Sequence, residues 1–395
     1  MLLNKISLFL KWALRVLSVA IKFVVPLKLV IEQLPIELSS VVSMWINCDV
    51  SLTYNHTIFF LLGCVDKMDY ANSPNFNAQK KRFQHPAGDP SDKTVADLFK
   101  IMKEFSNRAS DQSEKQGFPV TFSDQATLSA FSESVIWIGQ SSVLLNHNGF
   151  TILTDPNFSD RASPVGFAGP KRVTPAPFEI SDLPVVDVVL ISHNHYDHLD
   201  RASIVDLIAY QPLIKFFVPL GLAKTLREWG ANDVTELDWW QTAMLNGIEI
   251  QPTPVQHWSK RSFFDRNKSL WAGWMVKWSD FSFYFAGDSG YSDDFKETAK
   301  RLGSPTIAAI PIGAYEPRDF MKAAHMNPEE AVQTFVDLGA KYAFAIHWGT
   351  FKLTTEPMGE PKVRLRHSLT ENDIAFHRFR ALQHGEEWRT PIREK

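Results

Sequence analysis

The chain has 395 residues, of which 45% are hydrophobic and 22% are charged, so it can bury the core of one large domain and carry further segments. Its formal net charge of -3 gives no basis for binding nucleic acid, which is a polyanion. The two cysteines, Cys48 and Cys64, can pair with each other but form no disulfide framework. A metal site in the main part of the chain must therefore use histidine and carboxylate ligands.

Residues 1–65 are more apolar than the sequence that follows. Lys11, Arg15 and Lys22 fall on one side of a helical wheel with apolar residues elsewhere, which predicts a basic amphipathic helix. Such a helix lies in a membrane interface with its cations towards anionic head groups. We therefore predict peripheral or monotopic membrane association through residues 1–65 and leave the compartment open. A single transmembrane anchor and an apolar cap or dimer surface are the alternatives.

The segment 66–130 joins this region to the main domain. Residues 66–90 are polar and rich in Asn, Pro, Gly and Lys, which is typical of a linker. Apolar residues then recur at helical spacing between residues 94 and 108, which predicts a helix that packs on the main domain as an adaptor. We therefore divide the chain into residues 1–65, 66–130 and 131–395, of which the last is the predicted catalytic domain.

The main domain begins with short strands separated by turns. A turn at Gly139 and a hairpin signal at Asn148-Gly149 divide this part of the chain. The strands are predicted at residues 135–138, 142–146 and 151–154. The loop that follows, residues 157–177, is rich in Pro and Gly and carries basic side chains, so we expect it to shape the mouth of a cleft. These cations either attract a phosphate or are simply solvated.

The next strand leads into the motif around which the domain is organised. Residues 185–191 are apolar and rich in β-branched side chains, which predicts a buried strand. The loop at its C-terminal end, residues 193–200, reads His-Asn-His-Tyr-Asp-His-Leu-Asp. Four side chains of this loop suit a borderline cation such as zinc, which takes nitrogen and oxygen ligands: His193, His195, Asp197 and His198. One loop therefore offers half of each of two adjacent metal sites.

Three later strands each end at a single His or Asp. The apolar runs at residues 248–252, 281–286 and 342–346 lead to His257, Asp288 and His347, respectively. The C-terminal ends of strands are where open α/β sheets place their ligands. The sequence therefore predicts two zinc ions per chain. One is held by His193, His195 and His257, the second by Asp197, His198 and His347, and Asp288 bridges the pair.

These residues, in this order, resemble the metallo-β-lactamase superfamily. Longer blocks around them are similar to its N-acylphosphatidylethanolamine-hydrolysing phospholipase D family, over about residues 83–387. The blocks are residues 153–164, 169–172, 189–200, 217–222, 236–240, 256–258, 285–291, 309–318, 327–331, 346–351 and 384–386. The resemblance implies an α/β fold, the αββα sandwich with a dinuclear zinc site at one edge of its two sheets. It also implies that two chains pair as a homodimer.

A mechanism follows from such a site. Two zinc ions would hold a water as hydroxide at neutral pH, and this hydroxide would attack the phosphorus of a phosphodiester. Asp197 is the predicted catalytic residue that orients the hydroxide and relays its proton. By resemblance, Tyr196 and His325 correspond to positions that bind the phospholipid head group, and His325 could donate to the phosphate or the leaving oxygen. Lys260, close behind His257, is expected at the rim where anionic lipid docks.

Each of these substrate contacts has a simpler alternative. Tyr196 can be packing beside the metal loop, His325 can be an exposed residue ahead of a helix, and Lys260 can be a rim charge without a partner. The chain also departs from the family at Gln140, where relatives have a histidine, so any support that this histidine gives to the metal site is altered. The apolar region at residues 1–65 is longer than the polar leader of the family.

The sequence therefore predicts a membrane-associated zinc phosphodiesterase that converts N-acylphosphatidylethanolamine into N-acylethanolamine and phosphatidic acid. An alternative is a hydrolase of the same fold that acts on another phosphodiester, a phosphate ester or a lactone. A third hypothesis is a membrane-bound lipid or partner binder without catalysis. Retention of all the predicted ligands weighs against that third hypothesis.

Overall fold

The computed structural model describes residues 70–86, 88, 112–262 and 264–389. The predicted membrane-binding region, residues 1–65, and the predicted helix at residues 94–108 lie outside this part of the chain. Within it, none of the helices has the length and apolar character needed to cross a membrane.

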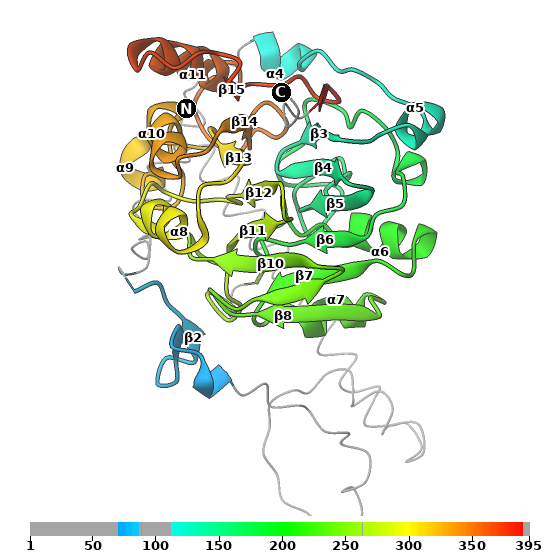
Figure 1. Cartoon of the computed structure of the whole chain (residues 1–395), viewed down its shortest axis with the longest axis vertical. Coiled ribbons are helices and arrows are strands. Elements are labelled where there is room, and N and C mark those ends of the chain that lie inside the picture. The colour runs from blue at the N-terminus through cyan, green and yellow to red at the C-terminus, as the bar shows by residue number, and fades with distance from the viewer. Residues whose placement is uncertain (1–69, 87, 89–111, 263, 390–395) are drawn as a thin grey trace, which may run out of the picture. The chain divides into compact units, whose positions relative to one another are not determined.

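Two seven-stranded sheets lie between layers of helices and form an αββα sandwich (Figure 1). The first sheet has the order β16-β3-β4-β5-β6-β7-β8. Its strands are β3 (Ser134–Gly139), β4 (Ser142–His147), β5 (Phe150–Thr154), β6 (Val188–Leu190), β7 (Lys215–Pro219), β8 (Asp233–Leu237) and β16 (Glu387–Arg389). Strands from β16 to β5 pair antiparallel, and strands from β5 to β8 pair parallel.

The second sheet repeats this plan, with the order β15-β14-β13-β12-β11-β10-β9. Its strands are β9 (Ala243–Leu245), β10 (Ile248–Thr253), β11 (Gly273–Lys277), β12 (Ser282–Phe285), β13 (Ile307–Pro311), β14 (Tyr342–Ile346) and β15 (Phe379–Arg380). Strands β9 to β12 pair antiparallel, and β12 to β15 pair parallel. A small separate sheet joins β1 (Phe76–Asn77) to β2 (Arg82–Phe83).

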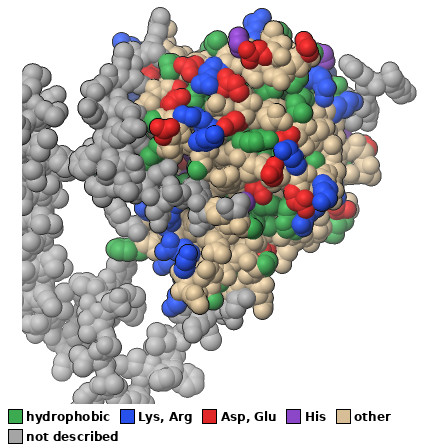
Figure 2. Space-filling view, turned by 90° about the vertical axis from the view of Figure 1, so that its left-hand side faces the viewer, with side chains coloured by type: hydrophobic (Ala, Val, Ile, Leu, Met, Phe, Trp, Pro, Cys, Tyr) green, Lys and Arg blue, Asp and Glu red, His purple; other side chains and the backbone are tan. Residues whose placement is uncertain are grey.

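Helices cover the outer face of each sheet. The helices of the first half of the chain are η1 (Tyr70–Asn72), α4 (Gln112–Gln116), α5 (Gln125–Ser129), η2 (Ile180–Asp182), α6 (Arg201–Tyr210) and α7 (Ala223–Glu228). All of these except η1 and α4 contribute side chains to the apolar cluster on the outer face of the first sheet. Those of the second half are α8 (Asp294–Leu302), α9 (Arg318–Met321), α10 (Pro328–Asp337) and α11 (Glu360–Glu371). Figure 2 shows one outer face, where acidic and basic side chains are interspersed, as expected for exposed helices.

The core consists of two clusters of buried apolar side chains. One lies between the sheets and extends under the helices of the second half, and it includes Trp137 and Trp274. The other packs β-strands of the first sheet against α6 and α7, for example through Leu207 and Leu226. Because the strands are covered on both faces, β3, β4 and β5 are buried along their whole length. Their sequence therefore lacks the alternation of a half-exposed strand.

The predicted fold class, an α/β sandwich of the metallo-β-lactamase type, is confirmed for the part of the chain that the structure describes. The strands predicted at residues 135–138, 142–146 and 151–154 lie within β3, β4 and β5. Asn148 and Gly149 take positive φ angles of 51° and 74°, as a tight hairpin requires. The strand predicted at residues 185–191 is shorter, because only Val188–Leu190 pairs with its neighbours and Val185 is exposed.

Candidate metal centre

The predicted metal ligands lie at one edge of the sandwich, where strands of both sheets end. The loop that carries His193 and His195 follows β6 of the first sheet. His257, Asp288 and His347 follow β10, β12 and β14 of the second sheet, respectively. Residues more than 150 positions apart in the sequence therefore meet in one buried cluster, in which His193 and His257 are almost completely inaccessible to solvent.

Three histidines form one group of donor atoms. Nδ1 of His195 lies 2.8 Å from Nε2 of His193 and 3.2 Å from Nε2 of His257. The donor atoms of this group all lie within 4.8 Å of one another. This spacing places three imidazole nitrogens around one position that a cation can occupy.

A second group lies directly beside the first. It consists of Asp197, His198, Asp288 and His347, whose donor atoms also lie within 4.8 Å of one another. Oδ2 of Asp288 is 3.0 Å from Nε2 of His198 and 3.1 Å from Nε2 of His347. The same oxygen is 4.0 Å from Nε2 of His193 and 3.9 Å from Nε2 of His257 in the first group. Asp288 thus stands between the two groups, in the position that the sequence predicted for a bridging carboxylate.

The pKa values of the second group show that its buried carboxylates need compensating positive charge. Burial lowers the pKa of His347, but the Asp288 and Asp197 carboxylates outweigh it and raise the pKa to about 9. Burial likewise raises the pKa of Asp288, but His198 and His347 hold it well below its usual range. Protons on histidines therefore balance the buried carboxylates, and a divalent cation would replace those protons.

The donor set fits a borderline divalent cation. It combines imidazole nitrogens with carboxylate oxygens and contains no thiolate, which suits zinc and related transition metals. Oδ1 of Asp288 is buried and finds no hydrogen-bond partner among the described residues. An uncompensated carboxylate oxygen in this position is costly, and coordination would satisfy it.

Neighbouring side chains hold the candidate ligands in place. Oδ2 of Asp155 lies 2.7 Å from Nδ1 of His198, and the carbonyl oxygen of Ala324 lies 2.9 Å from Nδ1 of His257. Such contacts fix the tautomer and the orientation of a metal-binding imidazole. Asp155 was not predicted as a site residue. The signal for it was its position immediately after β5, at the same edge of the sheet as the loop after β6.

Gln140, the departure from the family pattern, contacts the site directly. Its Nε2 donates a 2.8 Å hydrogen bond to Oδ2 of Asp197. Its backbone N–H donates to Oγ1 of Thr350, which also lies 2.9 Å from Nε2 of the buried His384. The amide therefore supplies the donor that keeps the Asp197 carboxylate in one orientation, and a short network fixes the backbone of Gln140.

Of the predicted substrate contacts, His325 lies at the cluster. Its ring centroid is 5.2 Å from that of His257 and 5.4 Å from that of His347, and its Nδ1 lies 3.9 Å from Oδ2 of Asp288. Burial lowers the pKa of His325 to about 3, so its ring is neutral at physiological pH. A neutral imidazole presents one N–H donor and one acceptor nitrogen.

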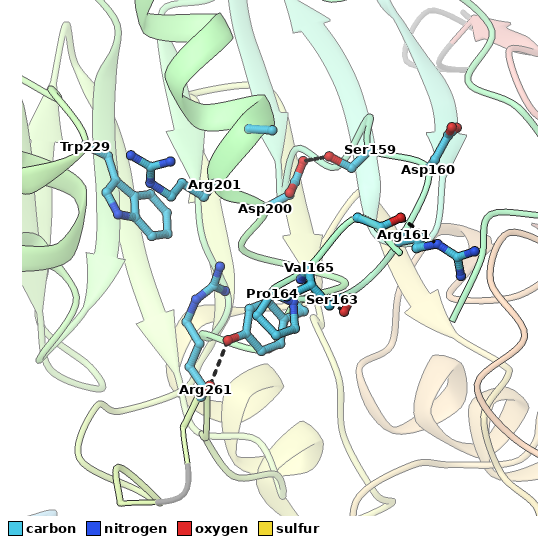
Figure 3. A pocket seen from close by; sticks show the side chains of 13 residues that line it. Ser159, Asp160, Arg161, Ser163, Pro164, Val165, Asp200, Arg201, Trp229 and Arg261 are labelled. Carbon is cyan, nitrogen blue, oxygen red and sulfur yellow. Dashed lines mark hydrogen bonds between the residues drawn. The ribbon is translucent and has the colours of Figure 1, made fainter. Parts of the chain in front are cut away.

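Tyr196 lines a cavity of about 490 Å³ beside the metal loop (Figure 3). Its hydroxyl donates a 2.8 Å hydrogen bond to the carbonyl oxygen of Arg261, and the Arg261 guanidinium lies over its ring at 4.1 Å. Arg261 also lines this cavity, whereas Lys260, the predicted rim cation, is half-buried and does not. The lining of the cavity also includes Pro164 and Val165, from the long loop after β5 (Figure 3).

Arg261 holds the loop of residues 193–200 in place through hydrogen bonds. This role was not predicted from the sequence. Its Nη1 donates to the carbonyl oxygens of Asn194, at 3.1 Å, and of Leu199, at 2.6 Å. These two carbonyls flank the stretch that carries His195, Asp197 and His198. The only sequence signal was a basic residue close behind His257, and that signal does not reveal which atoms the guanidinium binds.

The long loop after β5 is also held by an arginine. Arg172 is buried, and its Nε and Nη2 donate to the carbonyl oxygens of Ser159, at 2.9 Å, and Asn157, at 2.6 Å. The sequence left open whether the cations of this loop attract a phosphate or are solvated, and Arg172 does neither. It fixes the start of the loop that borders the cavity.

Comparisons with known proteins agree with this geometry. Residues 151–348, half of the chain, match the Beta-lactamase superfamily domain. The chain is 42% identical over 264 residues to N-acyl-phosphatidylethanolamine-hydrolyzing phospholipase D 1 of Caenorhabditis elegans, a match that covers 64% of this chain and 74% of the relative. It is 39% identical over 236 residues to the mitochondrial N-acyl-phosphatidylethanolamine-hydrolyzing phospholipase D of Saccharomyces cerevisiae, covering 58% of this chain and 50% of that relative.

Solved structures show the same fold at low identity. A possible metal-dependent hydrolase from Veillonella parvula superposes with a TM-score of 0.53 at 20% identity, over 66% of this chain and 99% of that protein. An isothiocyanate hydrolase from Delia radicum gut bacteria superposes with a TM-score of 0.52 at 21% identity, over 65% of this chain and 98% of that protein. These structures show the shared fold, and the sequence matches show that the chain is a hydrolase that belongs to the N-acyl-phosphatidylethanolamine-hydrolyzing phospholipase D family of the β-lactamase superfamily.

Proposed function

We propose that the chain is a zinc-dependent phosphodiesterase of phospholipase D type, which hydrolyses N-acylphosphatidylethanolamine to N-acylethanolamine and phosphatidic acid at a membrane. The observation that supports this most is the pair of donor groups that meet at Asp288, beside the cavity that Tyr196 lines. The relatives from C. elegans and S. cerevisiae, which are named for this lipid, supply the substrate class.

Seven side chains would hold two zinc ions. They are His193, His195 and His257 for the first ion, Asp197, His198 and His347 for the second, and Asp288 for both. Zinc ions bound there would make a water nucleophilic at neutral pH and would offset the negative charge that grows on the phosphoryl oxygens. The rest of the chemistry belongs to side chains of the protein.

Asp197 is the proposed proton acceptor and orients the attacking water. Gln140 supports this role, because its amide holds one oxygen of the carboxylate. His325 would donate an N–H hydrogen bond to the phosphate or to the leaving oxygen of the ethanolamine group, and Tyr196 and Lys260 would bind the head group. As the water oxygen bonds to phosphorus, the bond from phosphorus to the ethanolamine oxygen breaks, and Asp197 relays the proton taken from the water to that leaving oxygen.

The membrane association is proposed to use residues 1–65, as a peripheral or monotopic attachment. Pairing of two chains as a homodimer stays a prediction of the family resemblance. Neither proposal is needed for the geometry of the metal centre, so each can fail without affecting it.

The test is hydrolysis of N-acylphosphatidylethanolamine in mixed micelles, with metal content measured on the same preparations. We expect the parent protein to contain two zinc ions per chain and to release N-acylethanolamine. His195→Ala should lose both properties, whereas His325→Ala should keep the zinc and lose activity. His367→Ala is the matched control, because His367 is exposed on α11, 3.4 Å from Glu371, and should keep both.

One result would contradict the proposed substrate while leaving the metal centre intact. If the parent holds zinc and cleaves soluble phosphate esters or lactones but leaves this phospholipid unchanged, the alternative hydrolase is correct. If the parent binds no divalent cation after dialysis against zinc, the proposed chemistry is wrong.

A further inference from the structure

Two phenylalanines are almost fully exposed at the surface. The side chains of Phe167 and Phe264 are 84% and 86% exposed, more than any other aromatic side chain in the described part of the chain. A single exposed apolar side chain is common in soluble proteins and needs no explanation. The position of these two, relative to the cavity beside the metal loop, is what distinguishes them.

Both phenylalanines lie in loops that border that cavity. Phe167 follows Val165 and Gly166, which line the cavity, and Phe264 follows closely behind Arg261, which lines it as well (Figure 3). The loops that contribute to the lining of the cavity therefore carry the two most exposed aromatic side chains of the described residues.

Each loop is fixed by its own hydrogen bonds. The Arg161 guanidinium donates to the carbonyl oxygens of Gly166, at 3.0 Å, and Gly169, at 2.7 Å, and these two residues flank Phe167. The Asp265 carboxylate accepts from the backbone N–H groups of Arg261, at 3.0 Å, and Ser262, at 2.7 Å. The phenylalanines thus project from closed turns, which keeps the entropic cost of inserting them low.

The same loops carry local positive charge on a chain whose net charge is -3. Residues 160–172 contain three cations, Arg161, Lys171 and Arg172, against one anion, Asp160. Residues 260–268 contain four cations, Lys260, Arg261, Arg266 and Lys268, against one anion, Asp265. Of these, Lys171 and Lys268 are exposed. Aromatic side chains flanked by cations are the composition of a surface that binds anionic phospholipid.

We propose that these two loops dock the enzyme on an anionic phospholipid bilayer. Phe167 and Phe264 enter the boundary between head groups and acyl chains, Lys171 and Lys268 face lipid phosphates, and the cavity opens towards the lipid. The docking surface is made of residues other than 1–65. It deepens the proposed function and rests on it for the identity of the substrate, though not for the binding itself.

A second apolar area competes for this role. Val185, Tyr210 and Leu213 are 78%, 62% and 90% exposed and border a cavity of about 500 Å³ next to β7. The only lysine that lines this cavity, Lys215, pairs with Asp233, and Asp187 lines it as well. This area therefore lacks the excess positive charge and does not adjoin the metal loop, which makes Leu213 a suitable control.

The experiment measures binding of the full-length protein to phosphatidylcholine vesicles with and without phosphatidic acid, in the absence of substrate. The variants are Phe167→Ser/Phe264→Ser, Lys171→Glu/Lys268→Glu and the control Leu213→Ser. We expect the phenylalanine double variant to lose about tenfold or more in vesicle affinity. The lysine double variant should lose the dependence on phosphatidic acid. Leu213→Ser should bind as the parent does.

Hydrolysis of a short-chain, water-soluble N-acylphosphatidylethanolamine serves as the second measurement. The phenylalanine double variant should cleave it at the parent rate and retain the parent metal content, because neither ring contacts the metal centre. Unchanged vesicle affinity of this variant, or an equal loss in Leu213→Ser, would overturn the docking surface. If the parent cleaves no lipid but the affinities differ as expected, the docking surface stands and the proposed substrate fails.

Discussion

Replacement of Arg261 by glutamine tests whether the geometry of the metal loop depends on a single guanidinium. The Nη1 atom of Arg261 bonds the carbonyl oxygens of Asn194 and Leu199, and its plane covers the ring of Tyr196. A glutamine is too short to reach both carbonyls and carries no charge. The loop between these carbonyls, which carries His195, Asp197 and His198, would therefore lose the hydrogen bonds that fix its backbone.

The expected magnitude follows from the contacts that are lost. A hydrogen bond from a charged donor contributes about 1.5–3 kcal/mol, and a cation–π contact about 0.5–2 kcal/mol. Because Arg261 is partly exposed, hydrogen bonds to water would offset part of the lost interaction free energy. We therefore expect the free energy of metal binding to weaken by about 1.4–2.8 kcal/mol, which is a 10- to 100-fold loss of affinity. Arg261→Lys keeps the charge but not the planar stacking, and it should restore the affinity in part.

The measurement is a competition titration with a chelator, together with the absorption spectrum of the cobalt-substituted protein. The spectrum reports the geometry around the cation, which a purely global loss of stability would not change. Arg301→Gln is the matched control, because the Arg301 guanidinium also lies over an aromatic ring, that of Trp240 at 4.5 Å, and pairs with Glu297, away from the metal loop. If Arg261→Gln binds metal with the parent affinity and spectrum, the Arg261 hydrogen bonds do not affect the metal site and this reasoning is wrong.

Three further predictions concern the residues around the cluster. Gln140→Met keeps the side-chain length but removes the donor to Asp197, which should cost about 1–2 kcal/mol of binding free energy for a cation held by the Asp197 group; a calorimetric titration identical to that of the parent would contradict this. Asp155→Asn should weaken metal affinity about 10- to 100-fold through His198, and unchanged metal retention during dialysis would refute it. Burial lowers the pKa of His384 to about 3, so the unfolded chain takes up a proton below about pH 6.5 that the folded chain resists, and stability falls as pH drops from about 6.5 towards 3. His384→Gln should flatten this slope by up to about 1.4 kcal/mol per pH unit in urea unfolding, and an identical slope would exclude it as a contributor.

The sequence predicts that the candidate ligands lie close together, because each of them stands at a recognisable place, and the structure shows this clustering. His257, Asp288 and His347 each follow an apolar strand, and the ends of strands converge at a sheet edge whatever the details of the fold. The prediction also succeeded at Asn148-Gly149, where the hairpin depends only on local backbone preference. Such predictions succeed because they depend on the backbone preferences of adjacent residues and need no contact between distant parts of the chain.

The contacts that support the ligands were not predictable in the same way. Gln140 meets Asp197 only after β3 and β6 have joined the same sheet, and Arg261 meets Asn194 only after the two sheets have packed, so no local pattern marks either pair. The sequence marked Arg261 only as a basic residue close behind His257, whereas the structure shows that its guanidinium binds backbone carbonyls. The direction in which a long polar side chain turns depends on which unpaired carbonyls the packed loops leave nearby. That information is absent from any short window of sequence.

The arrangement of ligands also links cation binding to the cohesion of the sandwich. The loop with His193, His195 and His198 follows a strand of the first sheet, whereas His257 and Asp288 follow strands of the second. A cation held by the first group therefore connects the two sheets, and so does one held by the second. Because a ligand that binds only the folded state stabilises it by mass action, removal of the cations should weaken the contact between the sheets as well as stop catalysis. Asp288 faces both groups, so the loss of its carboxylate should uncouple them even when each histidine remains.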